Sequence, residues 1–308
     1  MQDQLSLEER ASYLRALIEH APDPLRKEFS RRMEISWLYH DNALEGLVLS
    51  PDEIGAAIDG QVPEEPSLAN LFDEIRQHKA AIERVREWAK AKGAALDIDF
   101  LRELYAILAP EEVEGKKPPP FRKEALIQRL YFHEIESPEK IPARLKAFFQ
   151  WVNSEETRRS THVVRLAAKA HFQLLHIFPF PRHNGRIARL IMNAFLLDAG
   201  FPPAVIHSTE RQRYYESLRL SDNALAQLVK EALSTSIESS IRFLESRMPG
   251  ALVSKVQSIA HRKSAPTDEA IFEKDSEAEE ADAVDASRTS GCKKKSLKAI
   301  IKTTKAAK

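Results

Sequence analysis

The sequence predicts an all-α protein. Apolar residues recur at the three- and four-residue spacing of a buried helix face along most of the chain, as at Ile75, Ile82 and Val85. Only nine of the 308 residues are glycine, whereas a β-sandwich needs turn residues about every ten positions. One segment, residues 125–135, has enough β-branched and aromatic residues for a pair of strands. We therefore expect a helical protein with one small β-hairpin.

The charge and the cysteine content exclude other classes of protein. Lysine and arginine together number 46, as do aspartate and glutamate, so the formal net charge is zero. This balance gives no reason to expect nucleic acid or an anionic membrane as a partner. A lone cysteine, Cys292, cannot form a disulfide within the chain, which favours a reducing compartment. With no apolar run of about 18 residues and no export signal, we expect a cytoplasmic protein without membrane contact.

The first 95 residues are predicted to form an N-terminal region of stacked helices. Ser50 is suited to cap a helix, Pro51 to occupy its first position, and Glu53 to complete a capping box. A helix is therefore expected to begin at Pro51. The segment 42–46, which ends in glycine, is expected to end or interrupt the helix before it.

Residues 96–250 are predicted to form the core domain. Its start contains residues 110–120, where four prolines predict an extended connection that leads into the hairpin candidate. Helical periodicity then resumes in five segments, at residues 140–154, 162–176, 184–199, 210–220 and 223–247.

Residues 251–308 are predicted to form a charged, disordered tail. Positions 268–285 hold nine acidic residues and one lysine, and positions 288–308 hold eight basic residues and no acidic one. Segregated charge with few aromatic residues is typical of disorder. The tail is either a solvated extension or a basic end, residues 288–308, that contacts nucleic acid or acidic partners.

The stretch that can carry chemistry is residues 171–190, in which one helix runs through a proline-interrupted loop into another. The second helix begins with Asn184 and Gly185, and Arg186 and Arg189 follow on one of its faces. Backbone amides at a helix N-terminus together with two arginines form an anion site suited to a polyphosphate. In the alternative interpretation, the arginines only pair with acidic side chains.

Residues 178–189 resemble the signature of the Fic (Fido-fold) family, which reads His-Pro-Phe-x-Asp/Glu-Gly-Asn-Gly-Arg-x-x-Arg. Six positions match, namely Pro179, Phe180, Asn184, Gly185, Arg186 and Arg189. His171 precedes the signature at the family's spacing, and residues 200–203 and 213–218 follow it in the family's order. The resemblance covers residues 35–245.

This resemblance implies a Fic-type helical domain with a small β-hairpin flap. The family's usual activity is transfer of AMP from ATP to a hydroxyl group of a target protein. The implied nucleotide-binding residues are Asn184, Gly185, Arg186 and Arg189. The implied ligand is therefore ATP.

Two further segments resemble parts of the family. Residues 121–138 resemble the flap, which holds a segment of the target by strand addition, so an unknown target protein is an implied partner. Residues 41–46 resemble the inhibitory motif Ser/Thr-x-x-x-Glu-Gly/Asn, with Asp41 in the place of the hydroxyl residue. The resemblance implies that Glu45 pairs with Arg189 and blocks the seat of the ATP γ-phosphate. Otherwise Glu45 is an ordinary solvated carboxylate.

Three departures from the signature bear on catalysis. Phe178 stands where the family has its general base, and it has no titratable group. Arg182 stands where an acidic residue holds magnesium, and a guanidinium cannot bind a cation. His183 replaces a glycine that lets the loop approach phosphate closely, so the anion site is expected to be deformed. The base is absent, magnesium binding is in doubt, and no metal site is expected.

Some neighbouring residues are candidates to replace the lost groups. His183 lies in the loop and is a candidate base. His176 points about 200° away from Phe178 around the helix axis and is a poor substitute. The spacing of His171, His176 and His183 fits no common metal-ligand pattern. Arg182 is a candidate to supply the positive charge of the missing magnesium, so that nucleotide binds without metal.

Three functions remain open at this point. The loss of both base and metal ligand favours a pseudoenzyme that retains ATP binding, a regulatory protein contact, or both. The second function is an active protein adenylyltransferase with altered catalytic residues, in which His183 is the base. The third is a nucleic-acid- or protein-binding module that acts through the basic tail, residues 288–308.

Overall fold

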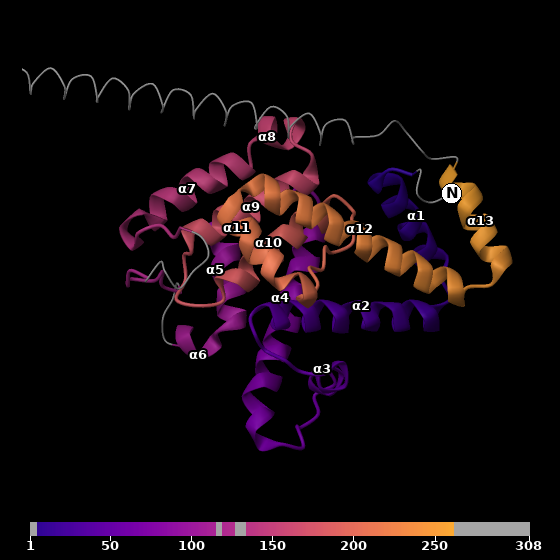
Figure 1. Ribbon diagram of the computed structural model, residues 1–308, viewed down its shortest axis with the longest axis horizontal. Helices are drawn as coiled ribbons and strands as arrows, with labels where there is room; N and C mark the ends of the chain where they lie inside the picture. The colour runs from indigo at the N-terminus through magenta and orange to yellow at the C-terminus, as the bar shows by residue number, and fades with distance from the viewer. Residues whose placement is uncertain (1–4, 115–118, 127–133, 262–308) are drawn as a thin grey trace, which may run out of the picture. The chain divides into compact units, whose positions relative to one another are not determined.

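Helices make up the regular secondary structure of this protein in the computed structural model, which describes residues 5–114, 119–126 and 134–261 (Figure 1). Within these residues there is no strand. The α-helices are α1 (Leu7–His20), α2 (Asp23–Leu44), α3 (Pro51–Ile58), α4 (Ala69–Lys90), α5 (Ile98–Leu108), α6 (Pro110–Val113), α7 (Ile141–Val152), α8 (Glu155–Ser160), α9 (Val163–Ile177), α10 (Asn184–Asp198), α11 (Arg211–Leu220), α12 (Asp222–Arg247) and α13 (Gly250–His261). In the same described residues, short 3₁₀ turns lie between some of these helices, at Pro66–Leu68, Pro138–Lys140 and Ser208–Glu210. The predicted all-α class is confirmed.

The predicted signals around residues 42–53 set the end of α2 and the start of α3. The hydroxyl of Ser50 accepts a hydrogen bond from the Glu53 amide (3.2 Å), and the Glu53 carboxylate accepts one from the Ser50 amide (2.7 Å). Helix α2 ends where Gly46 takes a left-handed conformation (φ 90°) and the amide of Leu47 donates to the carbonyl of Asn42 (3.0 Å). This turn fixes Glu45 at the C-terminus of α2.

The prediction for residues 110–120 was wrong at its start. Pro110 occupies the first position of the one-turn helix α6, where a missing amide hydrogen costs nothing because no helical bond would use it. Most of the predicted hairpin, residues 127–133, lies outside the described residues. Its described ends, 125–126 and 134–135, have no strand structure.

Helices α9 and α10 lie at the centre of the fold (Figure 1). Helix α9 packs against α10, α12 and α7, and α10 packs in addition against α4. Nearly every side chain of α10 is buried, including those of Arg186 and Arg189. Buried guanidinium groups are stable only when they are paired and hydrogen-bonded, so this packing predicts close partners for both.

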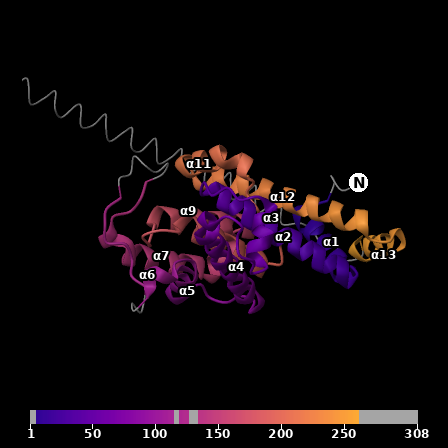
Figure 2. The same cartoon turned by 90° about the horizontal axis from the view of Figure 1, so that it is seen from below.

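The last described helices close one end of the molecule. Helix α12 extends from the core toward α1 and α13 (Figure 2). There α1 packs against both α12 and α13. The described helices therefore continue past residue 250, where the tail was expected to begin. Residues 262–308 lie outside the described residues, and the predictions of a disordered tail and of a nucleic-acid contact stay predictions.

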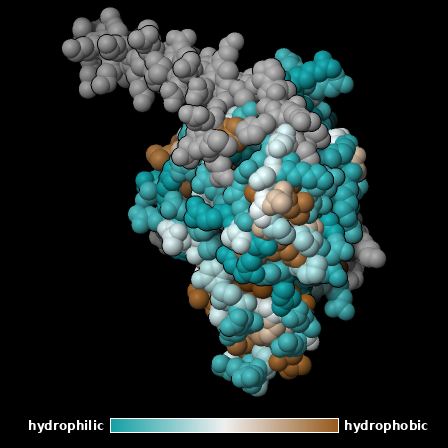
Figure 3. All heavy atoms as spheres, turned by 90° about the vertical axis from the view of Figure 1, so that its right-hand side faces the viewer, coloured by the Kyte–Doolittle hydropathy of each residue, from teal (hydrophilic) through white to brown (hydrophobic). Residues whose placement is uncertain are grey.

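The described surface offers no membrane-spanning element. Among the helices at residues 5–261 that the structure describes, none combines the length and the apolar character needed to cross a bilayer. The face in Figure 3 is mostly hydrophilic, with small hydrophobic areas between hydrophilic ones.

Candidate functional site

The loop between α9 and α10, residues 178–183, presents the N-terminus of α10. Both ends of the loop are left-handed, at Phe178 (φ 49°, ψ 62°) and at His183 (φ 60°, ψ 14°). Asn184 holds the loop, since its side-chain carbonyl accepts from the Phe180 amide (2.9 Å) and its amide group donates to the Phe180 carbonyl (2.8 Å). His183 thus takes the backbone conformation that favours glycine, and helix α10 begins normally after it.

Arg189 is the centre of the site. Its side chain is almost fully buried and donates hydrogen bonds to groups on α2 and α11. Its Nε donates to Oδ1 of Asp41, its Nη2 donates to Oε1 of Glu45 (2.6 Å), and its Nη1 donates to the hydroxyl of Tyr214 (3.1 Å). The same hydroxyl lies 3.0 Å from Nε2 of His171, which is also buried. The pair between Glu45 and Arg189 that the resemblance implied is present.

The carboxylate of Glu45 lies directly on Gly185 in the first turn of α10. A β-carbon placed on Gly185 would be 2.4 Å from Oε1 of Glu45, so a larger residue at this position would displace the carboxylate. Backbone N–H groups and the helix dipole favour a negative charge at this place. The carboxylate therefore lies beside the N-terminus of α10, where it accepts a hydrogen bond from Arg189.

A second carboxylate, that of Asp41, lies behind the first. Its Oδ2 is 2.9 Å from Nε2 of His78, and its backbone carbonyl accepts from Nη2 of Arg189 (3.4 Å). Burial alone would raise the pKa of Asp41, but Arg189 and His78 lower it to about 2. Burial lowers the pKa of His78. At neutral pH Asp41 is therefore charged and His78 is neutral.

Arg186 is also paired. Its Nη2 donates to Oδ1 of Asn42 (2.8 Å) and to Oε2 of Glu74 on α4 (3.0 Å). Its Nη1 donates to Nδ1 of His183 (3.1 Å). Both arginines of the predicted anion site thus have carboxylate partners. The ion pairs of the alternative interpretation are therefore formed by the same two arginines that the first interpretation assigned to an anion.

His183 is a poor base in this setting. Burial, together with Arg186 and Arg182, lowers the pKa of His183 to about 3. A guanidinium only donates, so Nδ1 is the acceptor and the ring proton is on Nε2. That Nε2 is buried and has no hydrogen-bond partner within the described part of the chain. The ring therefore has no lone pair left for a substrate proton.

Arg182 points to the surface helix α6. Its side chain is 46% exposed and pairs with Glu111 and, at 2.9 Å, with Glu112. The idea that Arg182 replaces magnesium is therefore not supported, because its charge is already neutralised. No group of three or more His, Cys, Asp or Glu side chains suited to a metal occurs among the described residues. The residues at the signature's metal position do not fit magnesium.

Arg122, which the sequence analysis did not single out, ties the described ends of the flap to the loop. It is buried, its backbone amide donates to the carbonyl of Pro179 (2.9 Å), and its Nε donates to the carbonyl of Phe178 (2.6 Å). Its Nη2 donates to the carbonyl of Glu136, whose own amide donates to the carbonyl of His176 (2.8 Å). Both described ends of the flap are thus held beside residues 176–179.

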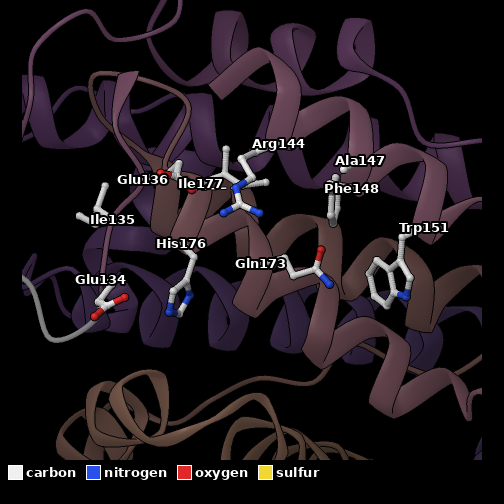
Figure 4. Close-up of a pocket in the computed structure, with 10 residues that line it drawn as sticks. All are labelled: Glu134, Ile135, Glu136, Arg144, Ala147, Phe148, Trp151, Gln173, His176 and Ile177. Carbon is white, nitrogen blue, oxygen red and sulfur yellow. Dashed lines mark hydrogen bonds and ion pairs between the residues drawn. The ribbon is translucent and has the colours of Figure 1, made fainter. Parts of the chain in front are cut away.

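His176 lines a cavity that does not include Arg186 or Arg189. This cavity, of about 630 Å³, lies between α7, the C-terminal half of α9 and residues 134–136 (Figure 4). Its lining includes His176, Gln173, Glu134 and Trp151 but none of the predicted nucleotide-binding residues. Nδ1 of His176 is 2.9 Å from the carbonyl of Phe172 one turn earlier. The three histidines considered as metal ligands thus lie in separate surroundings.

Comparison with known proteins gives similarity to one family. Residues 95–196 match the Fic/DOC family. A relative from Culex quinquefasciatus, named protein adenylyltransferase Fic, is 28% identical over 207 residues, which are 66% of this chain and 40% of the relative. A relative of the same name from Drosophila ananassae is 41% identical over 90 residues, 29% of this chain and 18% of the relative. The chain spans less than half the length of these relatives.

Solved structures show the same fold. A Fic-domain-containing signalling protein from Bacteroides thetaiotaomicron superposes with a TM-score of 0.67 at 23% identity, covering 79% of this chain and 99% of that one. Fic-1 from C. elegans superposes with a TM-score of 0.61 at 22% identity, covering 79% and 74%. At these identities the likeness concerns the fold alone.

Proposed function

Since this chain is a member of the Fic/DOC family, we propose that it binds the phosphate of a nucleotide, ATP being the first candidate, at the N-terminus of α10. We propose further that it does not transfer AMP by the family's chemistry. The implied nucleotide-binding residues Asn184, Gly185, Arg186 and Arg189 are all in the first two turns of this helix.

The position of the Glu45 carboxylate carries the first part of this proposal. An anion already rests on Gly185 and accepts a hydrogen bond from Arg189 (2.6 Å). A phosphate oxygen has the same charge and the same need for donors, so it competes with Glu45 for this place. Glu45 is then an internal inhibitor of nucleotide binding.

The surroundings of three side chains support the second part. Phe178 has no proton acceptor, and the one accepting nitrogen of His183 is occupied by Arg186. Arg182 is paired with Glu112 on α6 and holds no cation. Loss of a general base alone lowers a rate by about 10²–10⁴-fold, and here the base and the metal ligand are lost together. A pseudoenzyme fits these contacts better than an adenylyltransferase with His183 as its base.

The flap supports a contact with another protein. Its described ends are fixed to the carbonyls of Pro179 and His176 by the amides of Arg122 and Glu136. A segment of a partner added to the flap would lie next to the loop before α10. A regulatory protein contact at this place is therefore part of the proposed function.

Calorimetric titration of the full chain with ATP, with and without magnesium, tests the proposal. The parent is compared with Glu45→Gly, which removes the carboxylate, and with Glu45→Gln, which keeps its size. We expect both variants to bind ATP more tightly than the parent, and magnesium to change the affinity little. Absence of ATP binding by all three proteins would overturn the nucleotide-binding proposal.

Mass spectrometry tests the claim about catalysis. The parent and Glu45→Gly are incubated with ATP and cell lysate, and proteins are searched for an added AMP. We expect no AMP on any protein. Transfer by Glu45→Gly that disappears on adding His183→Ala would show that the chain is an active transferase with an altered base.

A further inference from the structure

Arg189 has two carboxylate partners that come from one helix face. Asp41 and Glu45 are four residues apart at the C-terminal end of α2 and bind different nitrogens of the same guanidinium. The two differ in exposure, because the Asp41 side chain is 5% exposed and that of Glu45 is 31% exposed. One partner is therefore inside the protein and the other is at the mouth of the site.

Only the outer carboxylate is free to leave. The carboxylate of Glu45 accepts one hydrogen bond among the described residues, from Arg189, and it follows the last residue of α2. Asp41 lies within α2, is held by Arg189 and is 2.9 Å from His78. Removal of one member of a buried ion pair leaves an uncompensated charge and is strongly unfavourable. Asp41 therefore stays in place when Glu45 moves out.

The charges of Arg186 and Arg189 are then balanced by carboxylates. Arg186 keeps Glu74, at 3.0 Å, and Arg189 keeps Asp41. The pKa of His78 and that of His183 are both lowered, so neither ring adds a positive charge at neutral pH. An incoming anion meets the α10 N-terminus and the Nη2 group of Arg189 that Glu45 has left, while Arg211 on α11 donates from Nε to the carbonyl of Leu44 (3.0 Å), the residue before Glu45.

We propose that Asp41 is a fixed counter-charge that sets the ligand class of this site. With Glu45 displaced, the site accepts one phosphate group, as in a nucleoside monophosphate, and it favours a nucleoside triphosphate only when Asp41 is neutralised as well. This inference rests on the proposed nucleotide binding and specifies its ligand. Asp41 acts through Arg189 and is a positioning residue.

The physical reason is the additional charge of a triphosphate. Each further phosphate group brings negative charge into a region where both arginines already have carboxylates. Charges a few ångströms apart in a partly buried site repel each other strongly. Arg182 does not compensate for this charge, because it pairs with Glu111 and Glu112.

Titration with AMP and with ATP, each in the absence of magnesium, tests the inference. The proteins are full-length Glu45→Gly and the double variant Glu45→Gly/Asp41→Asn. We expect Glu45→Gly to bind AMP at least as tightly as ATP. We expect the double variant to gain about tenfold or more in ATP affinity and much less in AMP affinity, so that the ratio of the two affinities rises about tenfold.

Asp59→Asn in the Glu45→Gly background is the matched control. It removes the same charge from the exposed pair between Asp59 and Arg31, and the ratio of ATP to AMP affinity is expected not to change. Thermal melting of each variant shows whether it is folded, and Asp41→Ser is the second choice if Asp41→Asn is not. A loss of stability alone lowers both affinities and does not change their ratio.

Two results would overturn the inference. The first is a Glu45→Gly protein whose affinity for ATP exceeds its affinity for AMP by more than tenfold. This result would show that the site favours a triphosphate while Asp41 is still charged. The second is a folded double variant whose ratio equals that of Glu45→Gly. In both cases the proposed nucleotide binding stands, whereas absence of binding of either nucleotide by every variant would overturn both proposals.

Discussion

His183 has a left-handed backbone (φ 60°), and Nδ1 of its partly buried ring accepts a hydrogen bond from Arg186. An isolated histidine has an ordinary pKa of about 6.5 and is a good base near neutral pH. In this protein, burial and the two arginines on either side lower the pKa of His183 to about 3. The residue type suggested a base, but the surroundings make the ring a neutral acceptor that orients Arg186.

The substitution His183→Gly is expected to make stability less dependent on pH. In the folded parent the pKa is about 3, below that of the unfolded chain, so only the unfolded chain takes up a proton as the pH falls below about 6.5. The parent thus loses stability from pH 6.5 toward pH 3, and the variant lacks this loss. Denaturant unfolding at pH 8, 6.5 and 5 is expected to show a growing advantage of the variant.

The difference in stability between His183→Gly and the parent at pH 8 reports the backbone effect alone, because histidine is uncharged there in the folded and in the unfolded chain. Relief of a left-handed conformation gains about 1–2 kcal/mol, whereas the greater freedom of unfolded glycine costs about 0.5–1 kcal/mol, so the relief of strain is the larger of the two effects. His183→Ala keeps the strain and is expected to be less stable than His183→Gly at pH 8, with the same pH trend. A difference from the parent that stays constant between pH 8 and pH 5 would contradict the lowered pKa.

The sequence predicted only part of the candidate site. Glu45 and Arg189 could be identified from the sequence because each belongs to a short local motif that resembles one of the family. Asp41 was noted only as a departure, although its spacing of four residues from Glu45 places both on one helix face. His78 is buried on the apolar face of α4, and a single histidine in such a face has no signature. Partners brought together by tertiary packing leave no local pattern.

Among the helices, the capped and strongly periodic ones were predictable. Ser50 and Glu53 form the expected capping box, and the five helical segments after residue 140 are present. Helix α6 was missed because proline was taken as a helix breaker, while Pro110 is in the one position where it is tolerated. The short helix α8 was missed as well, although Ser154 caps it. Short helices depend on their neighbours more than on their own sequence.

The substitution Arg122→Ala is expected to loosen the described ends of the flap. Arg122 donates to the carbonyls of Phe178 and Glu136, and its loss leaves these buried groups without that donor. The amide of Glu136, bound to the carbonyl of His176 at 2.8 Å, is then expected to exchange its hydrogen faster. Hydrogen exchange followed by mass spectrometry of residues 134–137 measures this rate.

Lys123→Ala is the control for this experiment, since Lys123 is the exposed neighbour of Arg122. It is expected to leave the exchange at Glu136 unchanged. Equal exchange in Arg122→Ala and the parent would show that the flap is held by other contacts. ATP affinity of a Glu45→Gly protein is expected to be similar with and without Arg122→Ala, because Arg122 donates to backbone carbonyls of the loop and of the flap.

At the scale of the whole protein, α13 is the last helix that the structure describes. Contacts divide the chain into Met1–Thr267 and Asp268–Lys308, and Val256 of α13 is fully buried. A chain that ends at Thr267 is therefore expected to unfold with the same free energy as the full chain. A chain that ends at Pro249 is expected to lose at least about 1.5–3 kcal/mol, the contribution of one buried valine. Denaturant unfolding of the three chains measures both differences.

The same truncation examines the alternative of a nucleic-acid contact. If residues 288–308 bind DNA or RNA, the affinity of the full chain falls steeply with salt and is lost in the chain that ends at Thr267. A full chain without salt-dependent binding would remove this alternative. Equal stability of the chains that end at Thr267 and at Pro249 would contradict the packing of α13 on α1.

The pairing of Arg186 and Arg189 with α2 and α4 has a consequence for how the chain folds. The hydrogen bond between Glu45 and Arg189 joins residues 144 positions apart, so these partners are absent from any intermediate made of α9 and α10 alone. In such an intermediate the two guanidinium groups have no carboxylate partners, because Asp41 and Glu45 belong to the end of α2 and Glu74 belongs to α4. Burial of these groups is favourable only together with their carboxylates, so we expect the ion pairs of the site to form when α2 and α4 pack around α10, with the Glu45 carboxylate already in place.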